Sequence, residues 1–281
     1  MKIALGTAQW GLNYGISNSS GIPSDKELIK IFNLAHQSNI LHFDTASVYG
    51  NAEKRLGDLA NNKSKIITKI SHNTKRYSLE NQVQNSLKNL KREKIYGCLF
   101  HDSDELINNM DLWNNLLRFK ESSVFEKIGF SVYEPKTLVK LIDCGLIPDI
   151  IQLPYSILDK KFEPYFPLLK QKGIEIHSRS IYLQGLYFKN TNKLPTKLKK
   201  LKPVLDYINK ICEEEDISIS SLCFNFIKSN KNIDFAVIGV ENHFQLLDII
   251  NFKKKNHYNK KIKNLNNAFH LDKNLLNPSN W

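Results

Sequence analysis

Long apolar segments and paired cysteines are both missing from this chain of 281 residues. Its apolar runs are far shorter than the about 20 residues that a membrane-spanning helix needs, so we expect no membrane partner. The first residues also lack the charged and apolar pattern of a secretory signal peptide. The cysteines are scattered without a CxxC pair, at Cys98, Cys144, Cys212 and Cys223. We therefore predict reduced thiols in a cytoplasmic protein, and neither a disulfide scaffold nor a zinc site.

Arginine is also scarce, although the chain is strongly basic. The net charge is +12, yet only five of the 40 basic residues are arginine. A basic chain can bind nucleic acid, but proteins that read a DNA sequence usually depend on arginine for bidentate contacts to bases. We therefore attribute the charge to composition and predict no nucleic-acid partner. In the same way, we interpret the lysine cluster 253–263 as the solvated face of a helix.

Eight short apolar segments have the length and the β-branched content of buried strands. Segments with helical spacing separate them, including 24–39, 78–93, 135–145 and 244–252. Ser24 and Ser78 each stand where a helix is expected to begin, and Glu27 would complete a capping box with Ser24. Strand followed by helix, repeated along the chain, predicts an α/β fold, a closed (β/α)8 TIM barrel. The expected strands are 2–8, 40–46, 64–70, 95–101, 127–133, 150–156, 175–181 and 234–240.

We expect residues 1–281 to form a single domain. The length suits one α/β barrel, and no linker rich in proline, glycine or serine divides the chain. Residues 186–204 exceed the minimal repeating unit and are expected to form a loop over the barrel mouth. Residues from about 253 to 281 are expected to form a tail that packs on or near the barrel.

Polar or small residues stand where the expected strands end, at Gln9, Asp44, Lys69, His101, Ser131, Gln152, Arg179 and Gly239. Barrel closure would bring these positions together at the end where such folds carry their chemistry. We expect the Lys69 ammonium to pair with Asp44, because a buried carboxylate is costly without a partner. Tyr49 would join them, and the ammonium would lower the pKa of its phenol. With His101 to orient a substrate oxygen, this cluster could protonate a carbonyl oxygen by general acid catalysis.

A divalent metal site is the alternative interpretation of the acidic residues beside His101. His101, Asp102 and Asp104 could supply part of such a site. A complete site needs further carboxylate or histidine ligands from neighbouring strands, and those strand ends carry Lys69 and Arg179 instead. We therefore predict that no metal is bound.

Several motifs, each on a different expected strand, resemble those of the aldo-keto reductases. In chain order they are LGTAQWG, FDTASVYGNAEKRLG, ITKI, LFHDSD, GFSVY, IQLPYS and VIGVENHFQLLD, and the resemblance covers residues 3–250. It implies a (β/α)8 barrel that binds NADP(H) or NAD(H) without a Rossmann fingerprint, and the sequence contains no GxGxxG motif. It also implies that Asp44, Tyr49, Lys69 and His101 are the catalytic residues.

The same resemblance implies a set of cofactor contacts. Ser131 and Gln152 match the positions that hold the nicotinamide carboxamide, and Arg179 stands where a tyrosine usually stacks on the nicotinamide ring. NADP(H) is the family default. No basic residue stands at Glu241 or Gln245 to bind a 2′-phosphate, so NAD(H) also suits the chain, because Glu241 could accept from a 2′-hydroxyl. The full expected set is Thr7, Ala8, Asp44, Ser131, Gln152, Arg179, Gly239, Glu241, Asn242, Gln245 and Asp248.

The predicted function is NAD(P)H-dependent reduction of an aldehyde or ketone, or the reverse, with Tyr49 as the general acid or base. The alternative is a non-catalytic barrel that binds a nicotinamide nucleotide and acts as a sensor or subunit. We expect a small-molecule partner and a monomer or weak homo-oligomer. Trp10 suits either the substrate wall or the core. The residues expected at the substrate are Gln9, Trp10, Tyr49 and His101, and a mouth formed by Gln9, Asn13, Tyr14, Tyr155 and Arg179 would favour a hydroxylated, sugar-like compound.

Overall fold

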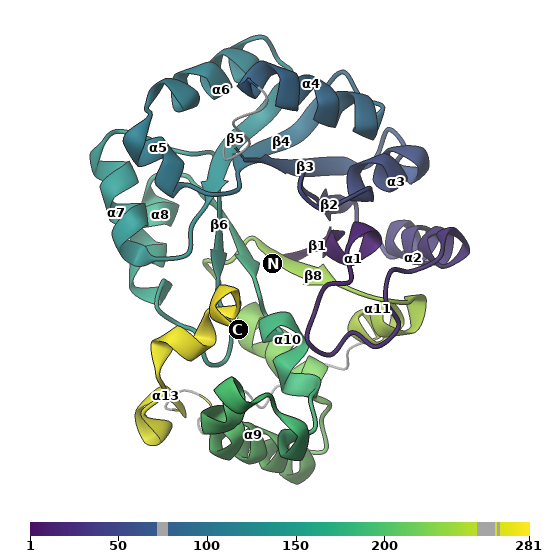
Figure 1. Cartoon of the computed structure of the whole chain (residues 1–281), viewed down its shortest axis with the longest axis vertical. Coiled ribbons are helices and arrows are strands. Elements are labelled where there is room, and N and C mark those ends of the chain that lie inside the picture. The colour runs from purple at the N-terminus through teal and green to yellow at the C-terminus, as the bar shows by residue number, and fades with distance from the viewer. Residues whose placement is uncertain (72–77, 252–261, 263–264) are drawn as a thin grey trace.

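A closed barrel of parallel strands forms the centre of the protein (Figure 1). The structure is a computed structural model that describes residues 1–71, 78–251, 262 and 265–281. Each strand pairs with the next along the chain, and the last strand pairs with the first, which confirms the predicted (β/α)8 fold. The strands are β1 (Lys2–Gly6), β2 (His42–Asp44), β3 (Lys65–Ile70), β4 (Ile95–Phe100), β5 (Phe125–Ser131), β6 (Ile150–Pro154), β7 (Glu175–Arg179) and β8 (Phe235–Gly239).

Helices surround the barrel and connect successive strands (Figure 1). Short 3-10 helices, η2 (Leu183–Phe188), η3 (Thr191–Lys193) and η4 (Thr196–Leu201), occupy the segment expected to cover the mouth. The α-helices are α1 (Ala8–Gly11), α2 (Asp25–Gln37), α3 (Ala52–Leu59), α4 (Leu79–Leu90), α5 (Asp104–Asn108), α6 (Asp111–Glu121), α7 (Pro135–Asp143), α8 (Phe166–Gln171), α9 (Lys202–Glu214), α10 (Ile219–Ser229), α11 (His243–Ile250) and α13 (Leu265–Phe269).

Two of the predicted helix caps are present, and one predicted contact is replaced. Ser24 accepts a hydrogen bond from the Glu27 amide at 3.3 Å, and Ser78 accepts from the Asn81 amide at 3.2 Å. The Glu27 carboxylate does not serve the expected capping box. It accepts from the His243 backbone amide at 2.8 Å and lies 2.6 Å from Nδ1 of the same residue. This contact joins α2, the first long helix of the barrel, to α11, the helix that follows the last strand.

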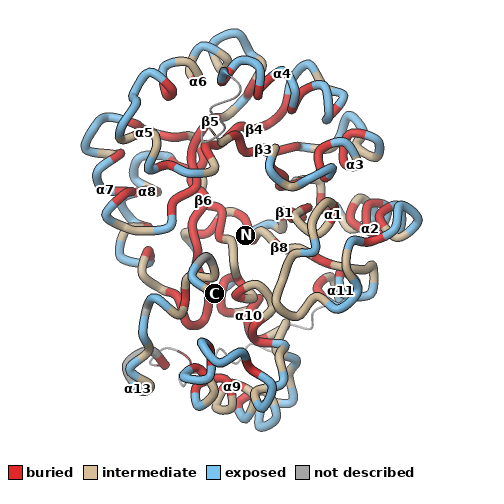
Figure 2. The backbone as a smooth tube through the Cα atoms, viewed as in Figure 1, coloured by how far each residue is buried: buried red, intermediate tan, exposed pale blue. Residues whose placement is uncertain are grey.

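Most of the apolar core lies between the strands and the surrounding helices. The inward face of α2 shows the pattern: Ile31 and Phe32 are buried, and the Phe32 ring stacks on Phe43 of β2 at 5.2 Å. Figure 2 shows this burial along the strands and on one side of each helix. A second, smaller cluster consists of strand residues alone, Ile67, Tyr96, Leu99 and Ile150. Lys69 is two residues beyond Ile67 on β3, so both side chains point to the same face.

The described part of the C-terminal tail packs against the rest of the chain. Ile262 and Leu276 are buried, and the Ile262 carbonyl accepts a hydrogen bond from the Lys160 ammonium at 3.0 Å. The Phe269 ring of α13 lies 5.4 Å from the Tyr207 ring of α9. Apart from Ile262, the lysine cluster 253–263 lies outside the described residues. No helix in the described part of the chain is both long and apolar enough to cross a lipid bilayer.

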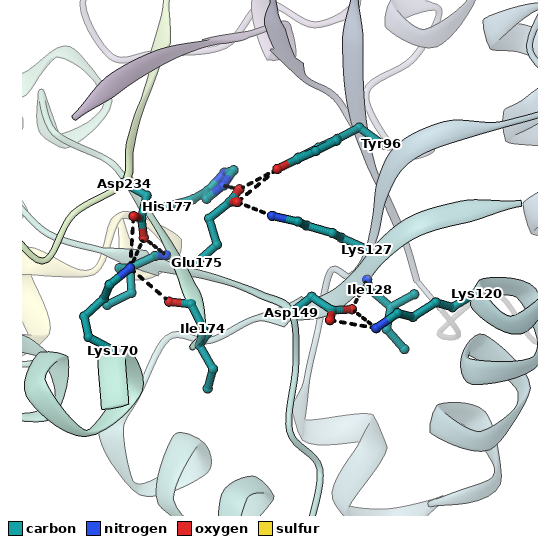
Figure 3. Close-up of polar contacts among 11 residues, drawn as sticks. Tyr96, Lys120, Lys127, Ile128, Asp149, Lys170, Ile174, Glu175, His177 and Asp234 are labelled. Carbon is teal, nitrogen blue, oxygen red and sulfur yellow. Dashed lines mark hydrogen bonds and ion pairs between the residues drawn. The ribbon is translucent and has the colours of Figure 1, made fainter. Parts of the chain in front are cut away.

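A polar cluster closes the end of the barrel where the strands begin (Figure 3). Glu175, the first residue of β7, accepts hydrogen bonds from the Tyr96 hydroxyl at 2.9 Å and from the Lys127 ammonium. His177 Nε2 lies 2.6 Å from the other carboxylate oxygen of Glu175. Burial raises the pKa of Glu175, but the hydrogen bonds and charges of His177 and Lys127 outweigh it and hold that pKa at about 2.

Glu175 should therefore make stability depend on acid pH. Its pKa is depressed below the ordinary value of 4.5, so its stabilising contribution is present above about pH 4.5 and is lost as the pH falls toward 2. Glu175→Gln removes a charged acceptor, and we expect it to lower the free energy of unfolding at pH 7 by about 2 kcal/mol. Urea unfolding at a series of pH values measures this, and the difference from wild type should shrink below pH 4.5.

The matched control is Glu126→Gln, which changes an exposed residue of β5. It should leave the free energy of unfolding unchanged within error at every pH. A Glu175→Gln difference that is absent at pH 7, or that stays constant into acid, would contradict this role of the cluster.

Candidate active site

Residues from three different strands meet in one hydrogen-bonded group. Asp44 is the last residue of β2, Lys69 is near the end of β3, and Gln152 lies in β6. Lys69 Nζ lies 2.5 Å from Asp44 Oδ1 and also donates to the Thr45 carbonyl at 3.0 Å. Gln152 Nε2 donates to Asp44 Oδ2 at 2.8 Å. Both carboxylate oxygens of Asp44 therefore have a donor, as the sequence led us to expect for Lys69.

The ion pair of Asp44 and Lys69 is almost completely buried. Their side chains are 4% and 1% exposed. Thr7 fixes the backbone of Asp44, because the Thr7 amide and hydroxyl donate to the Asp44 backbone carbonyl at 2.9 and 3.1 Å. A buried pair of this kind is costly to break, since removal of one partner leaves the other charge without compensation.

Tyr49 lies in the loop between β2 and α3, and close backbone contacts hold that loop in place. Its amide donates to the Ala46 carbonyl at 3.0 Å, and the Ser47 amide donates to the Lys69 carbonyl at 2.9 Å. Gly11, at the end of α1, packs directly against the loop: a Cβ at this position would lie 1.9 Å from the Tyr49 carbonyl oxygen. Only glycine permits this approach, so the position of Tyr49 depends on it.

The Tyr49 ring lies between two other members of the predicted cluster. Lys69 Nζ is 5.3 Å from its centroid, and the His101 ring meets it edge to face at 5.7 Å. Burial, and then the Asp44 carboxylate, raise the pKa of Tyr49 above its ordinary value of 10.0, while Arg179 acts to lower it. The predicted lowering by Lys69 is therefore wrong. Burial and the Asp44 carboxylate outweigh the effect of the nearby ammonium on the phenol.

His101 follows β4 and is mostly enclosed. Burial lowers its pKa to about 4, and the positive charges of Lys69 and Arg179 act in the same direction. The imidazole is therefore neutral at pH 7 and carries one N–H donor and one acceptor. A neutral donor beside a tyrosine is suited to hold a carbonyl oxygen without supplying a full charge.

A cavity of about 630 Å³ opens beside this group and extends to the start of α11. Tyr14, Asp44, Tyr49 and Arg179 line it near the strand ends, and residues of β8 and α11 line it further along. The sequence-predicted residues that line it are Thr7, Ala8, Gln9, Asp44, Tyr49, Gln152, Arg179, Gly239, Glu241, Asn242, Gln245 and Asp248. The arrangement therefore joins an elongated cavity to a fixed tyrosine at one of its ends.

Four predicted site residues are not among those that line the cavity. Lys69 and Ser131 are each 1% exposed, whereas His101 is half-buried and its ring contacts Tyr49, which does line the cavity. Trp10 is fully buried in the hydrophobic core, which favours its interpretation as a core residue. Its carbonyl accepts a hydrogen bond from Arg55 at 2.6 Å, so Trp10 anchors α1.

The polar mouth expected from the sequence differs in two positions, because neither Asn13, which is exposed, nor Tyr155 lines the cavity. Tyr155 is 1% exposed, and its hydroxyl donates to Glu163 at 3.1 Å, outside the cavity. The ring lies 5.1 Å from Phe166 and 5.0 Å from Phe226, so it belongs to the core.

Two loops that sequence analysis did not connect meet at the cavity. The Ile16 amide donates to the Gln184 carbonyl at 2.9 Å, and a Cβ on Gly185 would lie 2.0 Å from the Ser17 hydroxyl. Gly15 and Gly185 have φ of +108° and +88°, which favours glycine at both positions. In the sequence, these two glycines were the only local indication of the contact between the loops, because the contact joins segments far apart in the chain. Ser17, Gln184 and Gly185 thus line the cavity without having been predicted.

The far part of the cavity is acidic. Asn242 caps α11 by accepting from the Gln245 amide at 3.0 Å, and Gln245 Oε1 accepts from the Glu241 amide at 2.8 Å. Burial raises the pKa of Glu241. Asp248 also lines this part, and among the described lining residues Arg179 is the one cation. No group of three or more histidine, cysteine or acidic residues suited to a metal ion occurs in the described part of the chain.

Comparison with known proteins identifies relatives with the same architecture. The model of the aldo/keto reductase family matches residues 2–268. An uncharacterised oxidoreductase of Schizosaccharomyces pombe is 23% identical over 170 residues, which are 60% of this chain and 61% of that protein. The chain thus spans about three fifths of the length of this curated relative.

Solved structures share the barrel at low sequence identity. The holo form of an aldo-keto reductase from Bacillus halodurans superposes with a TM-score of 0.72 at 16% identity, covering 95% of this chain and 91% of that one. A Pseudomonas aeruginosa protein named as an aldo-keto reductase gives a TM-score of 0.65 at 19% identity, covering 88% and 87%. These similarities show the common fold.

Proposed function

We propose that this chain, which belongs to the aldo/keto reductase family, is an oxidoreductase that interconverts a small carbonyl compound and its alcohol with a nicotinamide cofactor. The observation that carries this proposal is the position of Tyr49. It is a fixed phenol on the wall of an elongated cavity, backed by the buried pair of Asp44 and Lys69. A nicotinamide bound in this cavity would supply or accept the hydride.

The cavity suits a long cofactor in both shape and lining. It joins the tyrosine to the first turn of α11, and Gly239 lies between these ends. A side chain at Gly239 would collide with Gln9, since its Cβ would lie 2.3 Å from Gln9 Oε1. Glycine here allows the Gln9 amide to pack against the backbone of β8 at the cavity wall. We propose that Thr7, Ala8, Gln152, Gly239, Asn242, Gln245 and Asp248 hold the cofactor, with Ser131 behind Gln152.

We propose that Tyr49 is the proton donor in carbonyl reduction. Its raised pKa keeps the phenol protonated at pH 7, so the proton is available when the carbonyl oxygen becomes negative. An alcohol is a far weaker acid than a phenol, so the alkoxide that forms takes a proton even from a tyrosine whose pKa is raised. His101, neutral at pH 7, holds the same oxygen through a ring N–H. This is general acid catalysis with electrostatic support.

Lys69 and Asp44 have a separate task in this scheme. After proton transfer the phenol becomes a phenolate, and the ammonium 5.3 Å from the ring centroid opposes the repulsion between Asp44 and that charge. Lys69 therefore limits how far burial and Asp44 raise the pKa of Tyr49. Gln152 keeps the carboxylate in the geometry that holds the ammonium there.

The acidic lining around α11 bears on the choice of cofactor. We propose that the enzyme accepts NAD(H) readily, although NADP(H) is the family default. Glu241 would repel a 2′-phosphate and can accept from a 2′-hydroxyl, as acidic residues do in other NAD sites. The described lining residues offer no cation at this end.

Tyr49→Phe tests the proton donor. The variant removes one hydroxyl and leaves the ring contacts with Lys69 and His101, so we expect the fold and the cofactor affinity to be unchanged. Turnover should fall by about 10²-fold or more, the usual size of a lost general acid. The measurement is steady-state carbonyl reduction, together with quenching of protein fluorescence by NADH and NADPH. Tyr165→Phe, outside the cavity, is the matched control, and near-wild-type turnover in Tyr49→Phe would remove the tyrosine from this role.

Glu241→Arg tests the choice of cofactor. We expect wild type to use NADH and NADPH with kcat/KM values within about tenfold, and the variant to shift the ratio toward NADPH by about tenfold or more, because a cation replaces a repelling carboxylate. Glu93→Arg changes the net charge equally on an exposed site and should leave the ratio unchanged. A wild-type enzyme that prefers NADPH by orders of magnitude, with no effect of Glu241→Arg, would show that the 2′-phosphate is bound by other residues.

A further inference from the structure

The guanidinium of Arg179 lies at the cavity and has no carboxylate partner among the residues that the structure describes. One terminal nitrogen donates to the Ser180 hydroxyl at 3.2 Å, and the other reaches the Val132 carbonyl at 3.4 Å. Its Nε is buried and has no hydrogen-bond partner. The group stacks on the Tyr133 ring, with the central carbon 4.0 Å from the ring centroid. Two weak contacts and a stack leave most of its donor capacity unused.

The carboxylates that surround this arginine are already engaged elsewhere. Asp44 forms an ion pair with Lys69 at 2.5 Å and accepts a hydrogen bond from Gln152 at 2.8 Å. The Asp159 carboxylate forms a long ion pair with Lys161 at 3.8 Å, and Arg179 acts on its charge without a direct ion pair. In the described part of the chain, no carboxylate forms an ion pair with Arg179. A partly buried cation without compensation is costly, and an anion that enters the cavity would relieve that cost.

Arg179 stands at the catalytic end of the cavity. It is the last residue of β7, next to the strand that carries Gln152. Its charge acts on the pKa values of Tyr14, Tyr49 and His101, which come from three different segments. The acidic residues Glu241 and Asp248 line the distant part instead. The cavity is therefore positive beside the proposed proton donor and negative at the far end.

We propose that Arg179 binds a carboxylate of the substrate, so that the substrate is an aldehyde or ketone with a carboxylate a few bonds from the reacting carbon. The planar guanidinium matches a carboxylate with two parallel hydrogen bonds, and its stack on Tyr133 presets the plane. The proposal rests on the proposed function and names the substrate class of that same site. The phosphates of the cofactor offer the same anionic oxygens, but Arg179 lies beside Tyr49, where the reacting carbonyl must sit.

The test compares acids with their esters. The probe pairs are 4-oxobutanoate with its methyl ester, and 4-formylbenzoate with its methyl ester, each reduced by wild type, Arg179→Met and Arg179→Lys. Loss of the arginine also alters the pKa of Tyr49, but that change affects acid and ester alike. The readout is therefore the ratio of kcat/KM for acid over ester. Arg118→Met, at an exposed position on α6, is the control for loss of one positive charge.

We expect wild type to prefer the acid, and Arg179→Met to lower the acid-to-ester ratio by at least about tenfold, the size of a lost charged hydrogen bond. Arg179→Lys should retain part of the preference for the acid over the ester, and Arg118→Met should retain all of this preference. An unchanged ratio in Arg179→Met overturns the proposal while leaving the reductase function intact. Weaker NADH binding in Arg179→Met at an unchanged ratio assigns the arginine to the cofactor and overturns the proposal as well.

A second measurement separates the proposal from the proposed function. Without cofactor, benzoate should raise the melting temperature of wild type more than benzamide does, and this difference should vanish in Arg179→Met. Absence of carbonyl reduction with every substrate would refute the proposed function, and a difference between benzoate and benzamide in that case would still support an anion site at Arg179. Equal effects of benzoate and benzamide on wild type overturn the anion site itself.

Discussion

The candidate site depends on one interaction, the buried ion pair between Asp44 and Lys69. The two residues come from neighbouring strands, and each strand places its side chain inside the barrel only because the parallel register holds. The Gln152 amide donates to the Asp44 carboxylate, and the Thr7 hydroxyl donates to the Asp44 backbone carbonyl. Asp44 in β2 is thus connected to β3, to β6 and to the residue that follows β1, at the end of the barrel where the cavity opens. A charge pair this deeply buried is a weak source of net stability, so its presence is better explained by what it does to Tyr49.

The charges of the site divide into three parts with different effects. Burial, and then the Asp44 carboxylate, set the direction of the Tyr49 pKa shift. Arg179 keeps an uncompensated positive charge at the catalytic end, and Glu241 and Asp248 give the other end a negative one. A substrate and a cofactor would therefore meet opposite fields in one cavity. This asymmetry is the physical basis of both proposals, a carboxylate on the substrate and tolerance of a free 2′-hydroxyl on the cofactor.

Much of this could be predicted from the sequence, because strand periodicity and barrel closure dictate which residues meet. Asp44, Lys69 and Gln152 each stand near the end of a short apolar run, and closure of the barrel brings such ends together. What could not be predicted depends on contacts between distant segments or on the sum of several charges. Glu27 leaves its own helix cap for His243, and Ser17 meets Gly185, with no local pattern to indicate either contact. The direction of the Tyr49 pKa shift was predicted wrongly because burial and Asp44 outweigh a single nearby ammonium.

The most direct test of the account is a double-mutant cycle between Tyr49 and Lys69. Turnover in carbonyl reduction is measured for wild type, Tyr49→Phe, Lys69→Met and the double variant, with folding of each checked by urea unfolding. If Lys69 acts through the proton transfer of Tyr49, the double variant loses no more activity than Tyr49→Phe alone, within about threefold, because both changes remove the same step. Losses that multiply would contradict the account, since they would mean that Lys69 contributes to the reaction independently of the tyrosine.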